Sequence, residues 1–507
     1  MNKTAVLVAL GAILLLLSSS WKLAGAYDGL IVTTARVGSI PVTIFRSASA
    51  APGPAVVIAH GFAGSQQFMQ PIAVTLARNG YVAVTFDFAG HGRNPEPLAG
   101  GIVDMQESTQ TLLAEIGAIV AYARALPGVD GRLALVGHSM ASDLVVQFAM
   151  ENPGVAATAA LSLFGRDVTP TNPPNLIVID GAWETSMLTD AGLRIIAAAA
   201  GGPARASVTY GDLAKGTGRR FALARGAEHI GVLYSRDALD ETLSWMNQTF
   251  GMRGSGFVDR RGKWLALLFA GLVAIAWPAS RLLPIVAARP LGANLGWRRL
   301  APLAAAPAIL TPLLLWKAPT DFLPILLGDY LAAHFALYGL LTAAGLWLTG
   351  RGAPDGWAPP AASLARLGIA AGALATYYVL GLGLPLDAYV ASFMPNALRW
   401  PLIPAMFCGT ALYFLADEWL TRGPAAARGG YAFTKICFLL SLVGAVALNR
   451  YRLFFLVIIV PAIFVFFLVY GLVSRWVYAR TGDPRAAALG NAAGLAWAIA
   501  VAFPVVG

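Results

Sequence analysis

From Trp264 onward the chain is a succession of apolar spans, and this feature limits its fold more than any other. A helix needs about 20 apolar residues to cross a bilayer, because each backbone polar group has to be bonded within the helix when it is surrounded by lipid. We count eight such spans, some of them short or interrupted by Pro. They lie near residues 264–287, 300–316, 323–349, 367–386, 400–416, 431–449, 453–474 and 486–506. The pattern predicts an all-α polytopic membrane domain of about eight transmembrane helices over residues 264–507.

The charge balance agrees with a membrane protein. Charged residues make up 12 % of the chain, against about 25 % in an ordinary soluble domain. The net charge is +10, but most Arg residues of the second half stand singly or in pairs between apolar spans, as in the loops of membrane proteins. We therefore expect membrane lipids and no nucleic acid as partners. Cys408 and Cys437 both fall in apolar spans, so the first half has neither a disulfide nor a thiolate nucleophile.

The N-terminus has the form of an export signal. Lys3 precedes an apolar run from Ala5 to Leu17, and Ala24-Gly25-Ala26 offers a cleavage site. We expect residues 1–26 to be a signal peptide or, if uncleaved, a signal-anchor helix. Either one carries the following domain across the membrane, so the sequence predicts a multi-pass protein with that domain on the extracytoplasmic side. The basic linker over residues 251–263 adds cations to that side, which opposes the usual charge bias of membrane proteins.

Residues 28–250 mix short apolar strands with helices that end at Gly or Pro. Strands that alternate with helices predict a doubly wound, mostly parallel sheet with helices on both faces. In such a sheet the functional side chains gather at the carboxyl ends of the strands. We therefore expect an α/β domain here and look for its site residues directly after the predicted strands.

The segment Gly137-His138-Ser139-Met140-Ala141 lies between a predicted strand and a predicted helix. In a G-x-S-x-G elbow a strained turn exposes the Ser hydroxyl, and small flanking residues let strand and helix approach closely. Ala141 replaces the last Gly and is small enough for that approach. Ser139 is therefore the candidate nucleophile, and the backbone N–H of Met140 is a candidate donor to a substrate oxyanion.

Two further kinds of residue complete the candidate site. His229 follows the last predicted strand, where the general base of such a site belongs. A carboxylate is needed between the Ser and the His in the sequence, to orient the imidazole. Asp180 and Glu184 both follow the strand that ends near residue 179, and position alone leaves both open.

Together these segments resemble the α/β-hydrolase superfamily, in particular its esterase, lipase and serine-aminopeptidase-like members, over about residues 28–250. The resemblance implies that Phe62, in His60-Gly61-Phe62, gives the second oxyanion donor, and that the D-x-x-G-H-G segment 87–92 shapes the loop beneath the site. It favours Glu184 as the acid, because the family places the acid three residues after a Gly, here Gly181. The expected catalytic residues are then Ser139, Glu184 and His229, with Phe62 and Met140 as the oxyanion hole, Asp180 as the alternative acid, and no metal or organic cofactor.

These expectations lead to one main hypothesis and two alternatives. The main hypothesis is a membrane-tethered serine hydrolase that cleaves a carboxylic ester, from a small molecule or a lipid, through an acyl-enzyme. An acyltransferase would use the same triad. A transporter or sensor with a hydrolase-fold receptor module would instead need organised polar residues in the membrane, where the clearest charges are Asp329, Lys435 and Arg281. The sequence leaves the oligomeric state open.

Overall fold

The structure, a computed structural model, describes residues 3–49, 51–101, 104–165, 168–352 and 361–507. It divides into two compact units, a sheet unit and a helical unit. The sheet unit consists of Leu17–Leu268, Leu386–Ser392 and Pro504–Gly507, and the helical unit of Met1–Leu16, Phe269–Pro385 and Phe393–Phe503. The sheet unit therefore extends beyond the predicted range 28–250 and includes two short segments from the second half of the sequence.

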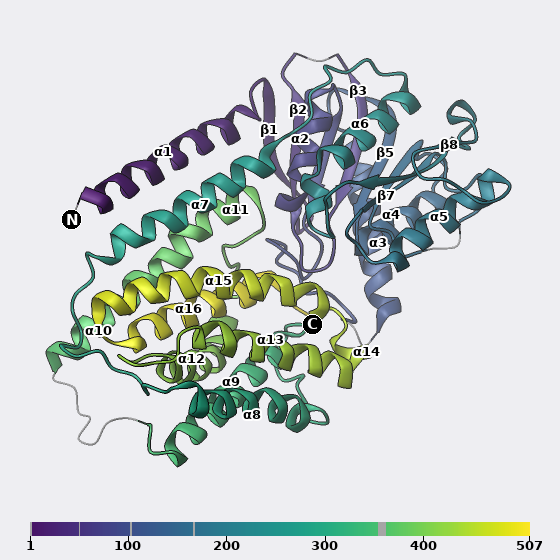
Figure 1. Cartoon of the computed structure of the whole chain (residues 1–507). Coiled ribbons are helices and arrows are strands. Elements are labelled where there is room, and N and C mark those ends of the chain that lie inside the picture. Colours follow the sequence, from purple (N-terminus) through teal and green to yellow (C-terminus); the bar gives the residue numbers. More distant parts are fainter. Residues whose placement is uncertain (1–2, 50, 102–103, 166–167, 353–360) are drawn as a thin grey trace. The chain divides into compact units, whose positions relative to one another are not determined.

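In the described residues, one sheet of nine strands forms the centre of the sheet unit, in the order β1-β2-β4-β3-β5-β6-β7-β9-β8 (Figure 1). The strands are β1 (Leu30–Val37), β2 (Ile40–Ser47), β3 (Gly53–Ala59), β4 (Val82–Phe86), β5 (Val129–His138), β6 (Ala157–Leu161), β7 (Leu176–Gly181), β8 (Thr209–Tyr210) and β9 (Arg219–Ala224). β4, β3, β5, β6, β7 and β9 run parallel, and β1, β2 and β8 pair antiparallel. The predicted mostly parallel sheet is confirmed, and its order reverses between β3 and β5.

Helices cover both faces of this sheet, because side chains that alternate along each strand are apolar on both sides. Helices α2 (Gln70–Arg78) and α6 (Arg236–Phe250) close one apolar core. On the other face lie α3 (Met105–Arg124), α4 (Met140–Glu151) and α5 (Ser186–Ala200). The sequence analysis did not predict α5 or β8.

The two remote segments bind the loops that follow β3 and β4. The Ser392 N–H donates to Ser65 Oγ at 2.9 Å, and the Asp387 carboxylate pairs with Arg93 at 2.5 Å. After α16 (Pro484–Ala502), Val505 accepts from the Leu98 N–H and donates to the Gly90 carbonyl oxygen, both at 2.9 Å. These hydrogen bonds and the ion pair hold the two loops, although the bonded residues are hundreds of positions apart in the sequence.

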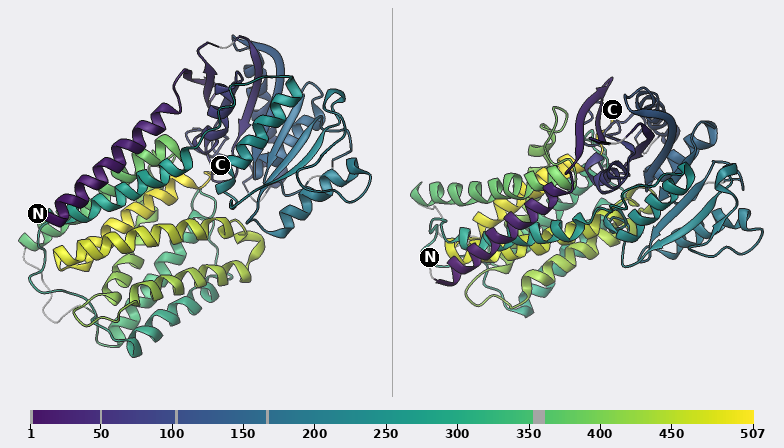
Figure 2. Two further views of the ribbon diagram at one scale, coloured as in Figure 1. Left: turned by 45° about the horizontal axis from the view of Figure 1, so that its top comes forward. Right: turned by 90° about the horizontal axis from the view of Figure 1, so that it is seen from above.

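The helical unit consists mainly of long apolar helices (Figure 2). Among the described residues, eight helices are long and apolar enough to cross a membrane. They are α1 (Lys3–Gly25), α7 (Arg261–Ser280), α8 (Trp297–Leu315), α9 (Gly328–Leu348), the continuous run Ala361–Tyr389, α13 (Gly430–Leu448), α15 (Leu456–Thr481) and α16 (Pro484–Ala502). The run Ala361–Tyr389 joins α10 (Ala361–Thr376) to α11 (Gly383–Tyr389) through the π-helical turn Tyr377–Leu382.

One helix of the second half, α12 (Leu402–Thr421), is long but too polar at its end to count among those eight. It ends with Asp417 and Glu418, both buried. Asp417 pairs with Lys435 of α13, and Glu418 pairs with Arg422 at 2.9 Å. Buried charges need such partners, because removing them from water without compensation costs several kcal/mol per ion. The helical unit thus holds more organised charge than the sequence analysis recognised.

Candidate active site

The turn between β5 and α4 carries Ser139 in a strained conformation. Its φ is 54° and its ψ −121°, a region that residues with a side chain avoid because Cβ crowds the backbone. The Ser139 N–H donates to the Leu161 carbonyl oxygen of β6 at 2.8 Å, which stabilises the turn. A Cβ on Gly137 would lie 2.3 Å from the Ala141 carbonyl oxygen. Gly137 is therefore required, whereas Ala141 fits as predicted.

The side chains of Ser139, Glu184 and His229 follow the ends of three different strands and are in contact with one another through His229. Its Nε2 lies 3.0 Å from Ser139 Oγ, and its Nδ1 lies 2.5 Å from Glu184 Oε1. The other Glu184 oxygen accepts from the Gly181 N–H at 2.6 Å and from the Ser162 hydroxyl at 2.9 Å. Because the carboxylate accepts a hydrogen bond from the Nδ1–H group, Nε2 has no proton and is free to accept that of the serine hydroxyl. Ser139 and His229 are thus in hydrogen-bond contact, which is the arrangement that a serine nucleophile and its base require.

Asp180, the alternative acid, does not reach His229. It lies at the end of β7, fully buried, and neither of its oxygens has a well-formed hydrogen bond among the described residues. Burial, and then the charge of Glu184, raises the pKa of Asp180 to about 7, although the Leu163 backbone N–H lowers it somewhat. Among the described residues the carboxylate that bonds the imidazole is that of Glu184, and Asp180 makes no such bond.

The His60-Gly61-Phe62 turn packs directly against the elbow. A Cβ on Gly61 would lie 2.9 Å from the Cβ of Ser139, so only Gly permits this approach. The Phe88 N–H donates to His60 Nε2 at 3.2 Å, and His60 Nδ1 then donates to the Gly61 carbonyl oxygen at 2.8 Å. Burial lowers the pKa of His60, which keeps the ring neutral and this turn fixed. Phe62 therefore belongs to a turn, and Met140 to an elbow, that pack against each other.

Residues 50–174 match the family model described as serine aminopeptidase, S33. This segment contains the His60-Gly61-Phe62 turn and the Ser139 elbow. This match lies within the sheet unit, which has an α/β-hydrolase-like fold. We call it the hydrolase domain below.

Individual proteins are also similar to part of this chain. A Variovorax paradoxus protein described as the carbamate hydrolase RutD is 32 % identical over 113 residues, which are 22 % of this chain and 38 % of that protein. An uncharacterized Mycobacterium tuberculosis protein is 30 % identical over 113 residues, 22 % of this chain and 37 % of that one. The chain thus spans less than two fifths of the curated relatives it matches.

Solved structures of hydrolases are also similar. One from Klebsiella pneumoniae, described as a dienelactone hydrolase, has 17 % identity and a TM-score of 0.34, and covers 45 % of this chain and 100 % of that chain. The ferulic acid complex of Est1E from Butyrivibrio proteoclasticus has 14 % identity and a TM-score of 0.33, and covers 43 % of this chain and 99 % of that chain.

The segment 87–92 of the hydrolase domain supports the loop beneath the site, as the resemblance implied. Asp87 accepts from the Gln66 backbone N–H at 2.8 Å and from the Arg93 N–H at 3.0 Å. Glu115 of α3, which the sequence analysis did not single out, accepts from the Ala89 N–H at 2.9 Å. Burial raises the pKa of Glu115 to about 7. Both carboxyls hold backbone N–H groups in place and lie outside the contacts of His229.

Two other residues near His229 have contacts that the sequence analysis did not predict. Ser162, which follows β6, holds the second oxygen of Glu184. His138 precedes the nucleophile and contacts the His229 carbonyl oxygen through Nε2 at 2.9 Å. Burial, followed by the nearby charge of His229, lowers the pKa of His138 to about 3. The His138 ring therefore stays neutral whether or not His229 is protonated. Neither role has a signal in the sequence, because each depends on a contact across strands.

Proposed function

We propose that the protein is a membrane-tethered serine hydrolase that cleaves a carboxylic ester. The observation that carries the proposal is the continuous contact Ser139 Oγ–His229 Nε2–Glu184, at 3.0 Å and 2.5 Å. A neutral imidazole in that contact can take the serine proton as the oxygen attacks an acyl carbon, and can return it to the leaving alcohol. Water then enters by the same route and releases the acid, while Glu184 stabilises the imidazolium in both steps.

The backbone N–H groups of Phe62 and Met140 are the proposed oxyanion donors. Phe62 follows Gly61, which packs against Ser139, and Met140 directly follows Ser139. Met140 also begins α4, where the first backbone N–H groups have no partner within the helix. Donors fixed before the reaction stabilise the developing charge without reorganising, which is commonly the largest catalytic contribution. The buried contacts of His60 and Gly61 support this rigidity.

Exposed apolar side chains support an apolar acyl group in the substrate. Trp183 and Met187 follow β7 and are 73 % and 54 % exposed, and Phe164, which follows β6, is 38 % exposed. They lie after the same strand ends that supply the triad, and large exposed apolar groups near a site commonly mark where a ligand binds. Trp183 directly precedes Glu184, so an acyl chain that covers it would lie beside the reacting centre.

A panel of p-nitrophenyl esters from acetate to decanoate tests this function. We expect kcat/KM of the purified full-length protein to rise several-fold from acetate toward the longer chains, since each methylene removed from water contributes up to about 0.8 kcal/mol. Transfer to added glycerol in place of water would identify the acyltransferase alternative. Absence of turnover for every ester and thioester would contradict the proposal.

The location of the hydrolase domain is a separate part of the proposal. The eight apolar helices support membrane tethering, and the charge ahead of the first one supports export of the domain that follows. In a variant without native cysteines (Cys408→Ser, Cys437→Ala), Lys215→Cys places a thiol where the native side chain is 79 % exposed. We expect a membrane-impermeant maleimide to label it in intact cells. Labelling only after lysis would place the domain in the cytoplasm.

A further inference from the structure

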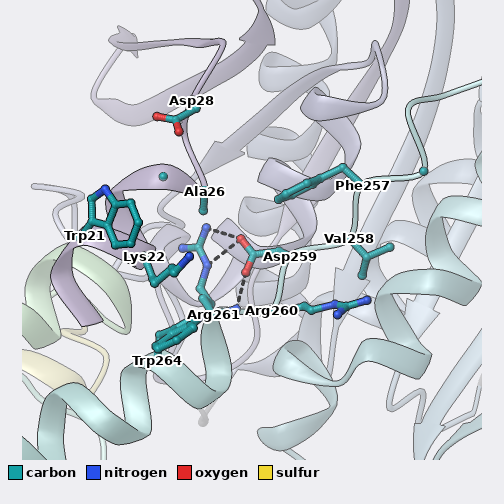
Figure 3. Close-up of a pocket in the computed structure, with 12 residues that line it drawn as sticks. Trp21, Lys22, Ala26, Asp28, Phe257, Val258, Asp259, Arg260, Arg261 and Trp264 are labelled. Atoms are coloured by element: carbon teal, nitrogen blue, oxygen red, sulfur yellow. Dashed lines mark hydrogen bonds and ion pairs between the residues drawn. The ribbon is translucent and has the colours of Figure 1, made fainter. Parts of the chain in front are cut away.

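A cavity of about 480 Å³ lies in the sheet unit where α1 ends and α7 begins (Figure 3). Its size is within the range of small-molecule sites, about 300–1,000 Å³. It is formed by the end of α1 and the residues after it, by the linker, and by the first turn of α7. Its lining residues are Trp21, Lys22, Gly25, Ala26, Asp28, Gly256, Phe257, Val258, Asp259, Arg260, Arg261 and Trp264. The cavity shares no residue with the site around Ser139.

Two tryptophans place this cavity at the level of a membrane surface. Trp21 ends the apolar run of α1, and Trp264 lies in the first turn of α7, so both stand where an apolar helix meets the polar sheet unit. Trp is enriched at that boundary, because its ring is apolar and its N–H is polar. Trp21 is 70 % exposed in the chain alone, which is unusual for so large a ring unless lipid covers it.

The charges around the cavity differ in how they are satisfied. Asp259 and Arg261 form a buried pair at 2.7 Å, and Arg261 also donates to Gln70 and Tyr27. Lys22 and Arg260 are exposed and form no ion pair with any described residue. The Lys22 ammonium lies 4.5 Å from the ring centre of Trp21 and 5.9 Å from that of Trp264.

Figure 3 shows how these groups are arranged. Lys22 extends between Trp21 and Trp264 toward the Asp259–Arg261 pair, and Arg260 lies on the other side of that pair. The lining holds three cations and two carboxylates, of which Asp259 is already occupied by Arg261. The cavity therefore offers an excess of positive charge.

We propose that this cavity binds the phosphate of an anionic phospholipid headgroup. Lys22 and Arg260 supply the positive charge. Each cation near an acidic surface raises the affinity for the anionic lipid about fivefold. The rings of Trp21 and Trp264 and the apolar flanks of α1 and α7 suit the glycerol and acyl parts, which a free phosphate ion lacks. The inference depends on the membrane location proposed above, but it does not depend on hydrolysis.

Native mass spectrometry of the full-length protein in detergent tests the inference. The protein is titrated with phosphatidylglycerol, with phosphatidylcholine of the same chains, and with inorganic phosphate. We expect the wild type to retain phosphatidylglycerol at least tenfold better than phosphatidylcholine. Lys22→Gln with Arg260→Gln should weaken phosphatidylglycerol roughly 30-fold, two cations at about fivefold each, and should leave ester hydrolysis unchanged.

Lys215→Gln with Arg253→Gln is the matched control, because it removes the same charge from exposed residues outside the cavity. We expect it to retain phosphatidylglycerol like the wild type. Equal loss in the control and the cavity variant would show that only net charge matters and would overturn the site. Equal retention of the two lipids would also overturn it, and displacement of the lipid by millimolar inorganic phosphate would assign the cavity to free phosphate instead.

Discussion

Ser139→Ala is expected to lower kcat of ester hydrolysis by roughly 10⁵- to 10⁶-fold, the loss found when a triad nucleophile is removed elsewhere. The elbow should still fold, because the hydrogen bond of the Ser139 hydroxyl within the described residues is the one with His229, and the backbone bond to Leu161 stays. Some turnover should remain above the uncatalysed rate, since the oxyanion donors and the imidazole are still in place.

A fluorophosphonate probe gives a second measurement of the same variant. The wild type should be labelled on Ser139, and the alanine variant should not be labelled at all. Ser244→Ala removes an exposed hydroxyl from α6 and serves as the control that keeps full labelling. Undiminished labelling of Ser139→Ala would mean that another residue is the nucleophile.

Glu184→Gln is expected to lower kcat by about 10⁴-fold, the effect of an amide replacement of a triad acid. Glu184 accepts hydrogen bonds from His229, from the Gly181 N–H and from Ser162, and an amide has only one oxygen for these three donors. Its NH₂ group must therefore face a donor, and the imidazole tautomer that leaves Nε2 free is no longer favoured. KM should change much less than kcat, because Glu184 orients His229 and does not contact the ester.

Asp180→Asn is the matched control for that variant and should change kcat by less than about tenfold. Its effect on stability should depend on pH. The unfolded chain releases the proton of an Asp near pH 4, whereas the pKa of Asp180 in the folded domain is about 7 because of burial and the nearby Glu184. The folded state holds a proton that the unfolded state has lost, so the contribution of Asp180 to stability is full below about pH 4 and is lost as the pH rises to 7.

We therefore expect Asp180→Asn to raise the midpoint of thermal unfolding at pH 8, where the wild type carries a buried charge, and to have little effect at pH 4. Melting curves at both pH values, together with kcat at pH 8, separate the two acids. A loss of activity in Asp180→Asn as large as that in Glu184→Gln would contradict the assignment of Glu184.

The site residues could be predicted because each one follows a short apolar strand within a few positions. Ser139, Glu184 and His229 come from three strand ends, and a parallel sheet brings such ends to one edge whatever lies between them. The choice of Glu184 over Asp180 depended on a single offset from Gly181. In the structure Glu184 bonds the imidazole, and Asp180 makes no such bond among the described residues. Local patterns were sufficient to name these candidates.

Other parts could not be predicted, because their signals are not local. Asp417 lies one residue past the predicted end of its apolar span at 416, so its charge seemed to belong to a loop. In the structure α12 continues to Thr421, and Asp417 meets Lys435 across two helices.

The contacts of residues 386–392 and 504–507 with the loops near Ser65 and Leu98 have a consequence for how the protein is made. A chain grows from its N-terminus, so Ser139 and His229 are synthesised long before these partners. The loops that contain Ser65 and Leu98 meet their last hydrogen-bond donors and acceptors only after α16 has been translated. These loops can therefore be completed only when every helix of the second half has been synthesised.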